Sequence, residues 1–276
     1  MESLDRGLLE EALIASTTRA TTYLRSTYVS RKPVGLGKSG DLSREFDVVV
    51  EELILKTLRE YLGSIRLISE ERGSVGRGSW IAIVDPVDGS INFEAGLPIA
   101  SVSVGIAKNS GQVRIEDIEA AVVAEVFRDV TYFYDKSKGF KAFGIKAERR
   151  HPPSNIVLGY FESIESFRPY IRLSEVTDSK PRLRSLGSAA LDIVYVSLGM
   201  ALGFMDARAK LRNVDIAPSV AIANSLGAKA YLCNGERATT VEIDDIKRVE
   251  CLVVGYNEEI ARVLLKAVSN ESILST

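Results

Sequence analysis

A short apolar run that ends in two aspartates constrains this chain more than any other feature. Residues 80–84 are apolar and rich in β-branched side chains, which predicts a buried strand. Asp85 and Asp88 follow around a proline, and Gly89-Ser90 comes next. Such strand ends commonly carry ligand sites in α/β proteins. Carboxylates on a rigid turn suit Mg²⁺, and a Gly-Ser step can aim backbone N–H groups at a phosphate.

The same residues also fit an ordinary turn, because Asp, Pro and Gly all favour turns. That interpretation explains the backbone, but it leaves two acids unexplained at the end of a buried strand. A metal site predicts that further acids converge on Asp85 and Asp88 in the folded chain. The two interpretations therefore differ in what they require of the other acidic residues.

Composition indicates a globular protein with a large core. The 276 residues are 46% hydrophobic and 26% charged, and the net charge of −2 does not favour nucleic acid as a partner. The start lacks the pattern of a signal peptide, and no apolar run reaches the ~18 residues of a membrane span. We therefore expect no membrane partner and a cytoplasmic location. Cys233 and Cys251 lie far apart in sequence, and we expect both to be reduced.

The single histidine, His151, narrows the possible chemistry. It precedes Pro152-Pro153, a context more typical of a linker than of a catalytic residue. A single histidine excludes multi-histidine zinc sites, and its place beside the Pro-rich linker argues against a histidine-based triad. Acid–base chemistry must then rest on carboxylates, hydroxyls, lysines or metal-bound water.

Periodicity predicts alternating helices and strands. Helices are expected at 3–28, 46–62, 189–198 and 216–226, and strands at 66–69, 80–84, 100–107, 120–126, 131–134, 156–159, 203–206 and 228–232. Residues 31–41 are glycine-rich and predict a mobile loop that carries Lys38 and Asp41. The Pro-rich stretch 149–155 predicts a boundary between residues 1–150 and 151–276.

Further acids stand where predicted elements end. Asp41 closes the glycine-rich loop, Asp47 and Asp215 begin helices, and Glu70-Glu71 follows a strand. Taken singly, acids at helix N-termini are explained as caps that complement the helix dipole, and Glu70-Glu71 as a solvated pair.

Taken together, the acidic motifs resemble the inositol monophosphatase and fructose-1,6-bisphosphatase superfamily. Glu70-Glu71 resembles its Glu-Glu element, residues 85–93 its Asp-Pro-Ile/Leu-Asp-Gly-Thr/Ser-x-Asn-Phe signature, and residues 214–217 its Trp-Asp-x-Ala-Ala element. Residues 40–47 and 186–190 also fit. Val214 and Pro218 depart from the third element without removing a ligand, and residues 204–215 are most similar to the archaeal dual-specificity branch.

The resemblance implies an α/β fold, namely a layered α-β-α-β-α sandwich, with most metal ligands in the first half. It implies a Mg²⁺-dependent phosphatase in carbohydrate metabolism, which acts on inositol-1-phosphate and/or fructose-1,6-bisphosphate. It also implies a homodimer or tetramer. Two alternatives stay open: a 3′(2′),5′-bisphosphate nucleotidase, and a non-catalytic protein that binds a metal or a phosphometabolite.

The resemblance also implies roles for individual residues. Two or three Mg²⁺ ions would be held by Glu70, Asp85, the Val87 carbonyl, Asp88 and Asp215. Asp47, Glu70 and Ser90 would act in catalysis, Gly89 and Ser90 would bind phosphate, and Lys38 and Asp41 would act through the loop.

Substrate contacts are expected from Asp88, Ser188, Arg182, Arg184 and Arg208. Arg208 stands where animal relatives carry an acid, and a guanidinium suits a second phosphate through bidentate hydrogen bonds. A surface ion pair explains Arg208 equally well. Arg182 and Arg184 share a face of a predicted strand, but solvated side chains would show the same alternation.

Overall fold

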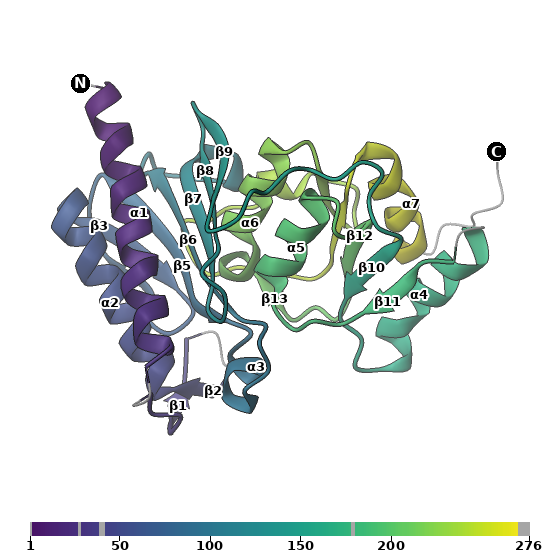
Figure 1. Ribbon diagram of the computed structural model, residues 1–276, viewed down its shortest axis with the longest axis horizontal. Helices are drawn as coiled ribbons and strands as arrows, with labels where there is room; N and C mark the ends of the chain where they lie inside the picture. The colour runs from purple at the N-terminus through teal and green to yellow at the C-terminus, as the bar shows by residue number, and fades with distance from the viewer. Residues whose placement is uncertain (1, 27–28, 39–41, 178–179, 270–276) are drawn as a thin grey trace.

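The chain folds into five layers that follow one another along its longest axis (Figure 1). The computed structural model describes residues 2–26, 29–38, 42–177 and 180–269. From the N-terminal side the layers are two helices, a seven-stranded sheet, two helices, a five-stranded sheet and two helices. This order confirms the layered α-β-α-β-α sandwich. Among the described residues, no helix is long and apolar enough to cross a membrane.

The first two layers are an outer helix pair and the seven-stranded sheet. Helices α1 (Glu2–Leu24) and α2 (Glu45–Leu62) pack against each other and against the sheet. The sheet has the order β4-β3-β5-β6-β7-β8-β9 and is antiparallel except for β3 and β5. Its strands are β3 (Ile65–Ser69), β4 (Gly73–Gly76), β5 (Trp80–Asp88), β6 (Ser101–Lys108), β7 (Ile118–Glu125), β8 (Thr131–Asp135) and β9 (Gly139–Phe143).

The central layer consists of α5 (Ala189–Ser197) and α6 (Asn213–Ser225), which lie between the two sheets (Figure 1). All nine residues of α5 are buried, as are most of those of α6. A helix that is apolar on every side needs cover on every side, and here the sheets supply it. For the same reason β5, β6 and β7 are buried along almost their whole length, since helices cover both of their faces.

The last two layers are the five-stranded sheet and the helices on its outer face. The sheet has the order β11-β10-β12-β16-β14, with β10 parallel to β11 and β12 and the other pairs antiparallel. Its strands are β10 (Ile156–Gly159), β11 (Arg182–Arg184), β12 (Gly203–Asp206), β14 (Lys229–Leu232) and β16 (Leu252–Gly255). Helices α4 (Ile164–Val176) and α7 (Glu258–Ser269) form the outer layer.

Short elements complete the fold. They are the ribbon of β1 (Pro33–Leu36) and β2 (Leu42–Arg44), the ribbon of β13 (Leu211–Arg212) and β15 (Arg248–Val249), helix α3 (Ser90–Ala95), and two 3₁₀ turns at Ile115–Asp117 and Ala238–Thr240. The structure adds helices α3, α4 and α7 and strands β4, β9 and β16 to the elements predicted from sequence, and β11 agrees with the strand expected at Arg182 and Arg184. It also differs at 31–41, where residues 33–36 form a strand rather than a loop.

One buried cluster joins the two predicted halves. It draws on Ile68, Ile83 and Tyr132 of the first sheet and on Phe204 and Val254 of the second. The strands of the larger sheet come from residues 65–143, and those of the smaller sheet from residues 156–255. The division at 150/151 stays a prediction, because a shared core does not test whether either half is a unit of its own.

The expectation of two reduced cysteines is wrong, because Cys233 and Cys251 form a disulfide. The pairing follows from register. Strands β14 and β16 are antiparallel with Leu232 opposite Leu252, so Cys233, which follows Leu232, lies opposite Cys251, which precedes Leu252. The two Cα atoms lie 5.5 Å apart, within the usual range for a disulfide. Sequence separation alone carries no information about this register.

Candidate active site

A cavity of about 630 Å³ receives residues from both halves of the chain. Its acidic lining residues are Asp47, Glu70, Glu71, Asp85, Asp88 and Asp215. Its basic lining residues are Arg44, Arg208, Lys210, Arg212 and Arg248. Gly89 and Ser90 also line it, as do the aromatic residues Tyr160 and Phe161.

An irregularity at the end of β5 turns both aspartates toward this cavity. Side chains three residues apart in a regular strand point to opposite faces. Asp85 pairs with Ser103 of β6 and Asp88 with Ser101, so β5 carries one extra residue between them. This bulge places Asp85 and Asp88 on the same face of the sheet. Pro86 lies within it, where the absence of a backbone N–H is tolerated.

Register also brings Glu70 to Asp85. Strands β3 and β5 run parallel with Ser69 beside Val84, so the next residue of each strand lies side by side. Asp215 enters from the first turn of α6. Oxygen atoms of Glu70, Asp85 and Asp215 lie within 4.8 Å of one another. This arrangement supplies three hard oxygen donors of the kind that Mg²⁺ and Ca²⁺ prefer.

Asp47 and Asp215 are both helix caps and cavity residues. Asp47 accepts a hydrogen bond from the backbone N–H of Arg44 at 3.0 Å, and Asp215 accepts one from Arg212 at 2.7 Å. Each aspartate thereby closes a capping box at the start of its helix. The capping interpretation is thus correct for both, and it leaves the second carboxylate oxygen of each outside that bond.

Burial and mutual repulsion hold these acids toward their neutral forms. Burial, and then repulsion from Glu70, Asp88 and Asp215, raises the pKa of Asp85 well above its usual range. Burial and the charge of Glu70 do the same to the pKa of Asp215. Burial, with smaller contributions from Glu71 and Glu70, raises the pKa of Asp47 to about 8. A divalent cation would relieve this repulsion, so the residues present fit a metal.

Asp88 lies at the N-terminus of α5 and joins the two halves of the chain. It accepts backbone hydrogen bonds from Ala189 at 3.0 Å and Ala190 at 2.9 Å. The hydroxyl groups of Ser188 and Ser101 also donate to it. Burial nevertheless raises its pKa. Ser188 therefore contacts Asp88 rather than lining the cavity, and the role of Asp88 as a metal ligand stays a prediction.

Two glycines allow the segments 85–93 and 186–190 to approach each other closely. Gly89 has a φ of +88°, and a Cβ there would lie 2.8 Å from the carbonyl oxygen of Gly187. Gly187 has a φ of +89°, and its Cβ would lie 2.6 Å from Nδ2 of Asn92. Asn92 donates to the carbonyl of Leu186 at 2.6 Å, which links residues 85–93 to residues 186–190.

Ser90 follows Gly89 as the first residue of α3 and lines the cavity. Among the hydrogen bonds between described residues, none joins its hydroxyl to Asp47. The predicted catalytic pair of Asp47 and Ser90, and phosphate binding by Gly89 and Ser90, stay predictions. Lys38 lies near the site, since its backbone N–H donates to the carbonyl of Glu71 at 3.2 Å. Asp41 lies outside the described residues.

The predicted substrate arginines divide into two groups. Arg208 lines the cavity, where it pairs with Asp206 and Glu162 and stacks over Tyr160 at 4.4 Å. Arg182 and Arg184 do not line it. They lie exposed on β11, which is an edge strand of the second sheet. The structure therefore does not bring these two arginines to the site.

Sequence reasoning identified Arg208 but missed the other basic residues of the cavity, Arg44, Lys210, Arg212 and Arg248. Lys210 and Arg212 alternate with Arg208 in sequence, and all three line the cavity. Arg212 lies 3.8 Å from the carboxylate of Glu70. Arg248 faces Arg212 across the β13–β15 ribbon. The alternation of positive charges over 208–212 was a usable signal, whereas the position of Arg248 depends on strand pairing alone.

The fold and the site together define a class: a mixed α/β enzyme with clustered carboxylates that are suited to a metal ion. Residues 6–271 match the inositol monophosphatase family, and the chain belongs to that family. The family is metal-dependent, and this chain is a phosphomonoesterase.

Named relatives agree with this assignment. An inositol-1-monophosphatase of Aeropyrum pernix is 33% identical over 79% of this chain and 82% of its own length. A fructose-1,6-bisphosphatase/inositol-1-monophosphatase of Methanocaldococcus jannaschii is 30% identical over 84% of this chain and 87% of its own. A solved structure of an inositol monophosphatase–fructose 1,6-bisphosphatase superposes with a TM-score of 0.75 at 26% identity, over 95% of this chain and 98% of its own.

Proposed function

We propose that this protein is a Mg²⁺-dependent phosphatase that hydrolyses inositol-1-phosphate, fructose-1,6-bisphosphate or both. The observation that carries the proposal is the convergence of Glu70, Asp85 and Asp215 within 4.8 Å, in a cavity that is also lined by basic residues. Carboxylates that hold a divalent cation can bind a phosphate and activate water, and basic side chains add further contacts to the phosphate.

Glu70, Asp85 and Asp215 would hold the first Mg²⁺, with Asp88 and the Val87 carbonyl as further ligands for a second or third ion. When bound, Mg²⁺ polarises the phosphate and lowers the pKa of a coordinated water. The supporting chemistry is the donor set: all of these ligands are oxygen atoms, which favours Mg²⁺ over softer metals.

The remaining residues would orient the phosphate and move the proton. Asp47 is buried and lines the cavity, a position that suits a group that exchanges a proton with an attacking water. Ser90, on the first turn of α3, would lie between Asp47 and the phosphate. The backbone N–H groups of Gly89 and Ser90 would hold the phosphate oxygens, and Lys38 and Asp41 would act through the adjoining loop.

Two relatives support the choice of substrate. One is named for inositol-1-phosphate hydrolysis alone, and the other also for fructose-1,6-bisphosphate. Arg208 lies in the cavity and would contact the distal part of the substrate. We further propose that the enzyme is cytoplasmic. We also propose that it forms a homodimer or a tetramer, and light scattering at several protein concentrations tests this oligomeric state directly.

The test is a substrate panel with Mg²⁺ and with EDTA. We expect release of phosphate from inositol-1-phosphate or fructose-1,6-bisphosphate with Mg²⁺ only, and a loss of at least about 10³-fold in Asp215→Asn. Asp117→Asn is the matched control, because Asp117 closes the same kind of capping box outside the cavity. Preferential hydrolysis of a 3′(2′),5′-nucleotide bisphosphate would instead favour the nucleotidase alternative. Absence of hydrolysis with every substrate would favour the alternative of a non-catalytic binding protein.

A further inference from the structure

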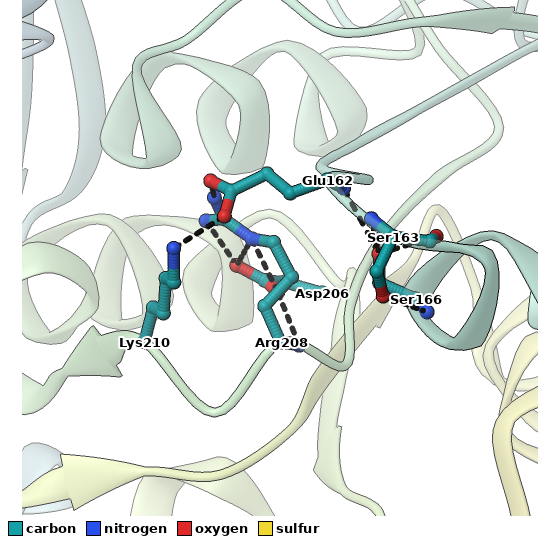
Figure 2. A network of polar contacts seen from close by, with 6 residues as sticks. All are labelled: Glu162, Ser163, Ser166, Asp206, Arg208 and Lys210. Carbon is teal, nitrogen blue, oxygen red and sulfur yellow. Dashed lines mark hydrogen bonds and ion pairs between the residues drawn. The ribbon is translucent and has the colours of Figure 1, made fainter.

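Four charged side chains form a compact network at the basic rim of the cavity (Figure 2). Glu162 lies at its centre, between β10 and α4, and its two carboxylate oxygens contact different cations. One oxygen binds a guanidinium nitrogen of Arg208, and the other binds the ammonium group of Lys210. Asp206 completes the network from β12. A single carboxylate thus bridges two cations at the edge of the candidate active site.

Arg208 is held in place without Glu162. Asp206 accepts three side-chain hydrogen bonds from it, at 2.7, 3.0 and 3.2 Å, and the ring of Tyr160 lies beneath its guanidinium. The side chain of Asp206 is only 1% exposed, so this pair belongs to the interior. The Arg208 guanidinium therefore remains oriented at the rim even when the outer carboxylate is elsewhere.

Glu162, in contrast, is built to release its partners. Its side chain is 49% exposed and that of Lys210 is 59% exposed, so water can replace either contact at little cost. The backbone of Glu162 is fixed separately, because its N–H donates to the Ser166 hydroxyl at 2.9 Å (Figure 2). Rotation of one side chain is thus enough to free Arg208 and Lys210, with no movement of the chain.

We propose that Glu162 determines specificity by occupying, as an internal anion, the Arg208–Lys210 pair that otherwise receives a second anionic group of the substrate. This inference rests on the proposed function of the same cavity. A phosphate ester with a neutral distal part leaves Glu162 where it is. A bisphosphate must displace the carboxylate, after which its distal phosphate binds both cations. Glu162 therefore selects, by competition, against substrates that carry a second phosphate.

The charges of the network support this competition. Asp206 and Glu162 together balance Arg208 and Lys210, so the network is neutral while Glu162 is in place. Once Glu162 has turned away, one positive charge remains uncompensated beside the cavity. A distal phosphate carries more negative charge than a carboxylate, and it has three acceptor oxygens. It can therefore replace the contacts of Glu162 with both Arg208 and Lys210.

The test is Glu162→Gln, which keeps the shape of the side chain and removes its charge. We expect the ratio of the KM for fructose-1,6-bisphosphate to the KM for inositol-1-phosphate to fall about fivefold, the effect of one partly exposed charge a few ångströms away. The kcat values should change little, and the effect should shrink in high salt. Glu165→Gln, three residues along on the exposed side of α4, is the matched control and should leave the ratio unchanged.

A second variant separates competition from a merely structural role. Adding Lys210→Met to Glu162→Gln should abolish the gain, because the cation released by the first change is then missing. An unchanged KM ratio in Glu162→Gln, or a gain that survives the loss of Lys210, would overturn the inference while the proposed function stands. Absence of any turnover in the wild-type protein would overturn both.

Discussion

Replacing Asp85 with asparagine should stabilise the metal-free protein while it abolishes catalysis. The carboxyl group is 3% exposed and lies within 4.8 Å of Glu70 and Asp215. At an effective dielectric constant of about 20, two unit charges at that separation repel by roughly 3.5 kcal/mol. Asparagine removes this repulsion and retains an oxygen that can accept the hydrogen bond from the Val87 N–H, which Asp85 now accepts at 3.1 Å.

Proton uptake limits the size of the effect. Uptake of a proton by the acid cluster relieves part of the repulsion, and each pH unit between the unfolded pKa of about 4 and a raised folded pKa costs about 1.4 kcal/mol. We therefore expect Asp85→Asn to raise the free energy of unfolding at pH 7.5 by about 2 to 4 kcal/mol. For a chain of this length that corresponds to a rise in Tm of about 4 to 8 °C.

The pH dependence has a defined sign. Because the pKa of Asp85 is raised in the folded protein, its contribution to stability is fully present below the unfolded pKa and is lost as pH rises through the folded value. The wild-type protein in EDTA should thus lose stability as pH rises above about 4, and Asp85→Asn should lose less. With Mg²⁺ at neutral pH, the wild-type protein should instead be more stable than Asp85→Asn, since it binds the ion more tightly than the variant.

Thermal unfolding in EDTA and in Mg²⁺, at a series of pH values, measures these effects. Asp135→Asn is the matched control, since Asp135 is also buried, at 1% exposure. Burial alone would raise its pKa, but hydrogen bonds from Ser137 and Lys138 outweigh burial and lower it. The same substitution should therefore cost about 1 to 2 kcal/mol there. A Tm of Asp85→Asn at or below that of the wild-type protein in EDTA would refute the reasoning.

Three further predictions concern parts of the structure around the site. Cys233→Ser should lower the free energy of unfolding in urea by about 3 kcal/mol, because the disulfide closes an 18-residue separation. Gly89→Ala should cost about 2 to 3 kcal/mol in thermal unfolding, since its Cβ would meet the Gly187 carbonyl, whereas Gly96→Ala, with a similar φ and open space, should cost about 1. Ser188→Ala should lower kcat about tenfold with little change in KM, and a dominant rise in KM would instead indicate direct contact with substrate.

Local periodicity was enough to predict much of the fold. The helix expected at 46–62 begins one residue earlier, at Glu45, and the strand expected at 80–84 continues to Asp88. Continuous apolar runs also indicated buried strands correctly, because burial on both faces removes the polar alternation. Helices α4 and α7 were missed, although α7 buries the regularly spaced Ala261, Leu264 and Ala267. The signal was present, because α7 is amphipathic in the same way as α2, whose apolar period predicts that helix correctly.

The acidic half of the site was also predicted from sequence, since its residues belong to short motifs at the ends of predicted elements. The motifs around Glu70, Asp85 and Asp215 identify these three acids in the sequence, and the fold brings them together. For Asp47 and Asp215, capping and function do not exclude each other. One carboxylate oxygen of each accepts the capping hydrogen bond, and the residue also lines the cavity.

What only the tertiary structure decided depends on register and on pairing between distant segments. The bulge that turns Asp85 and Asp88 to one face, and the pairing of Cys233 with Cys251, follow from which residue of one strand lies opposite which residue of its neighbour. Glu162 meets Lys210 across 48 residues of chain. Motifs and periodicity report the environment of nearby residues, and so they determine the kinds of element and the chemistry of the site. Contacts between elements are decided by packing, and it is packing that assigns the basic rim its partners.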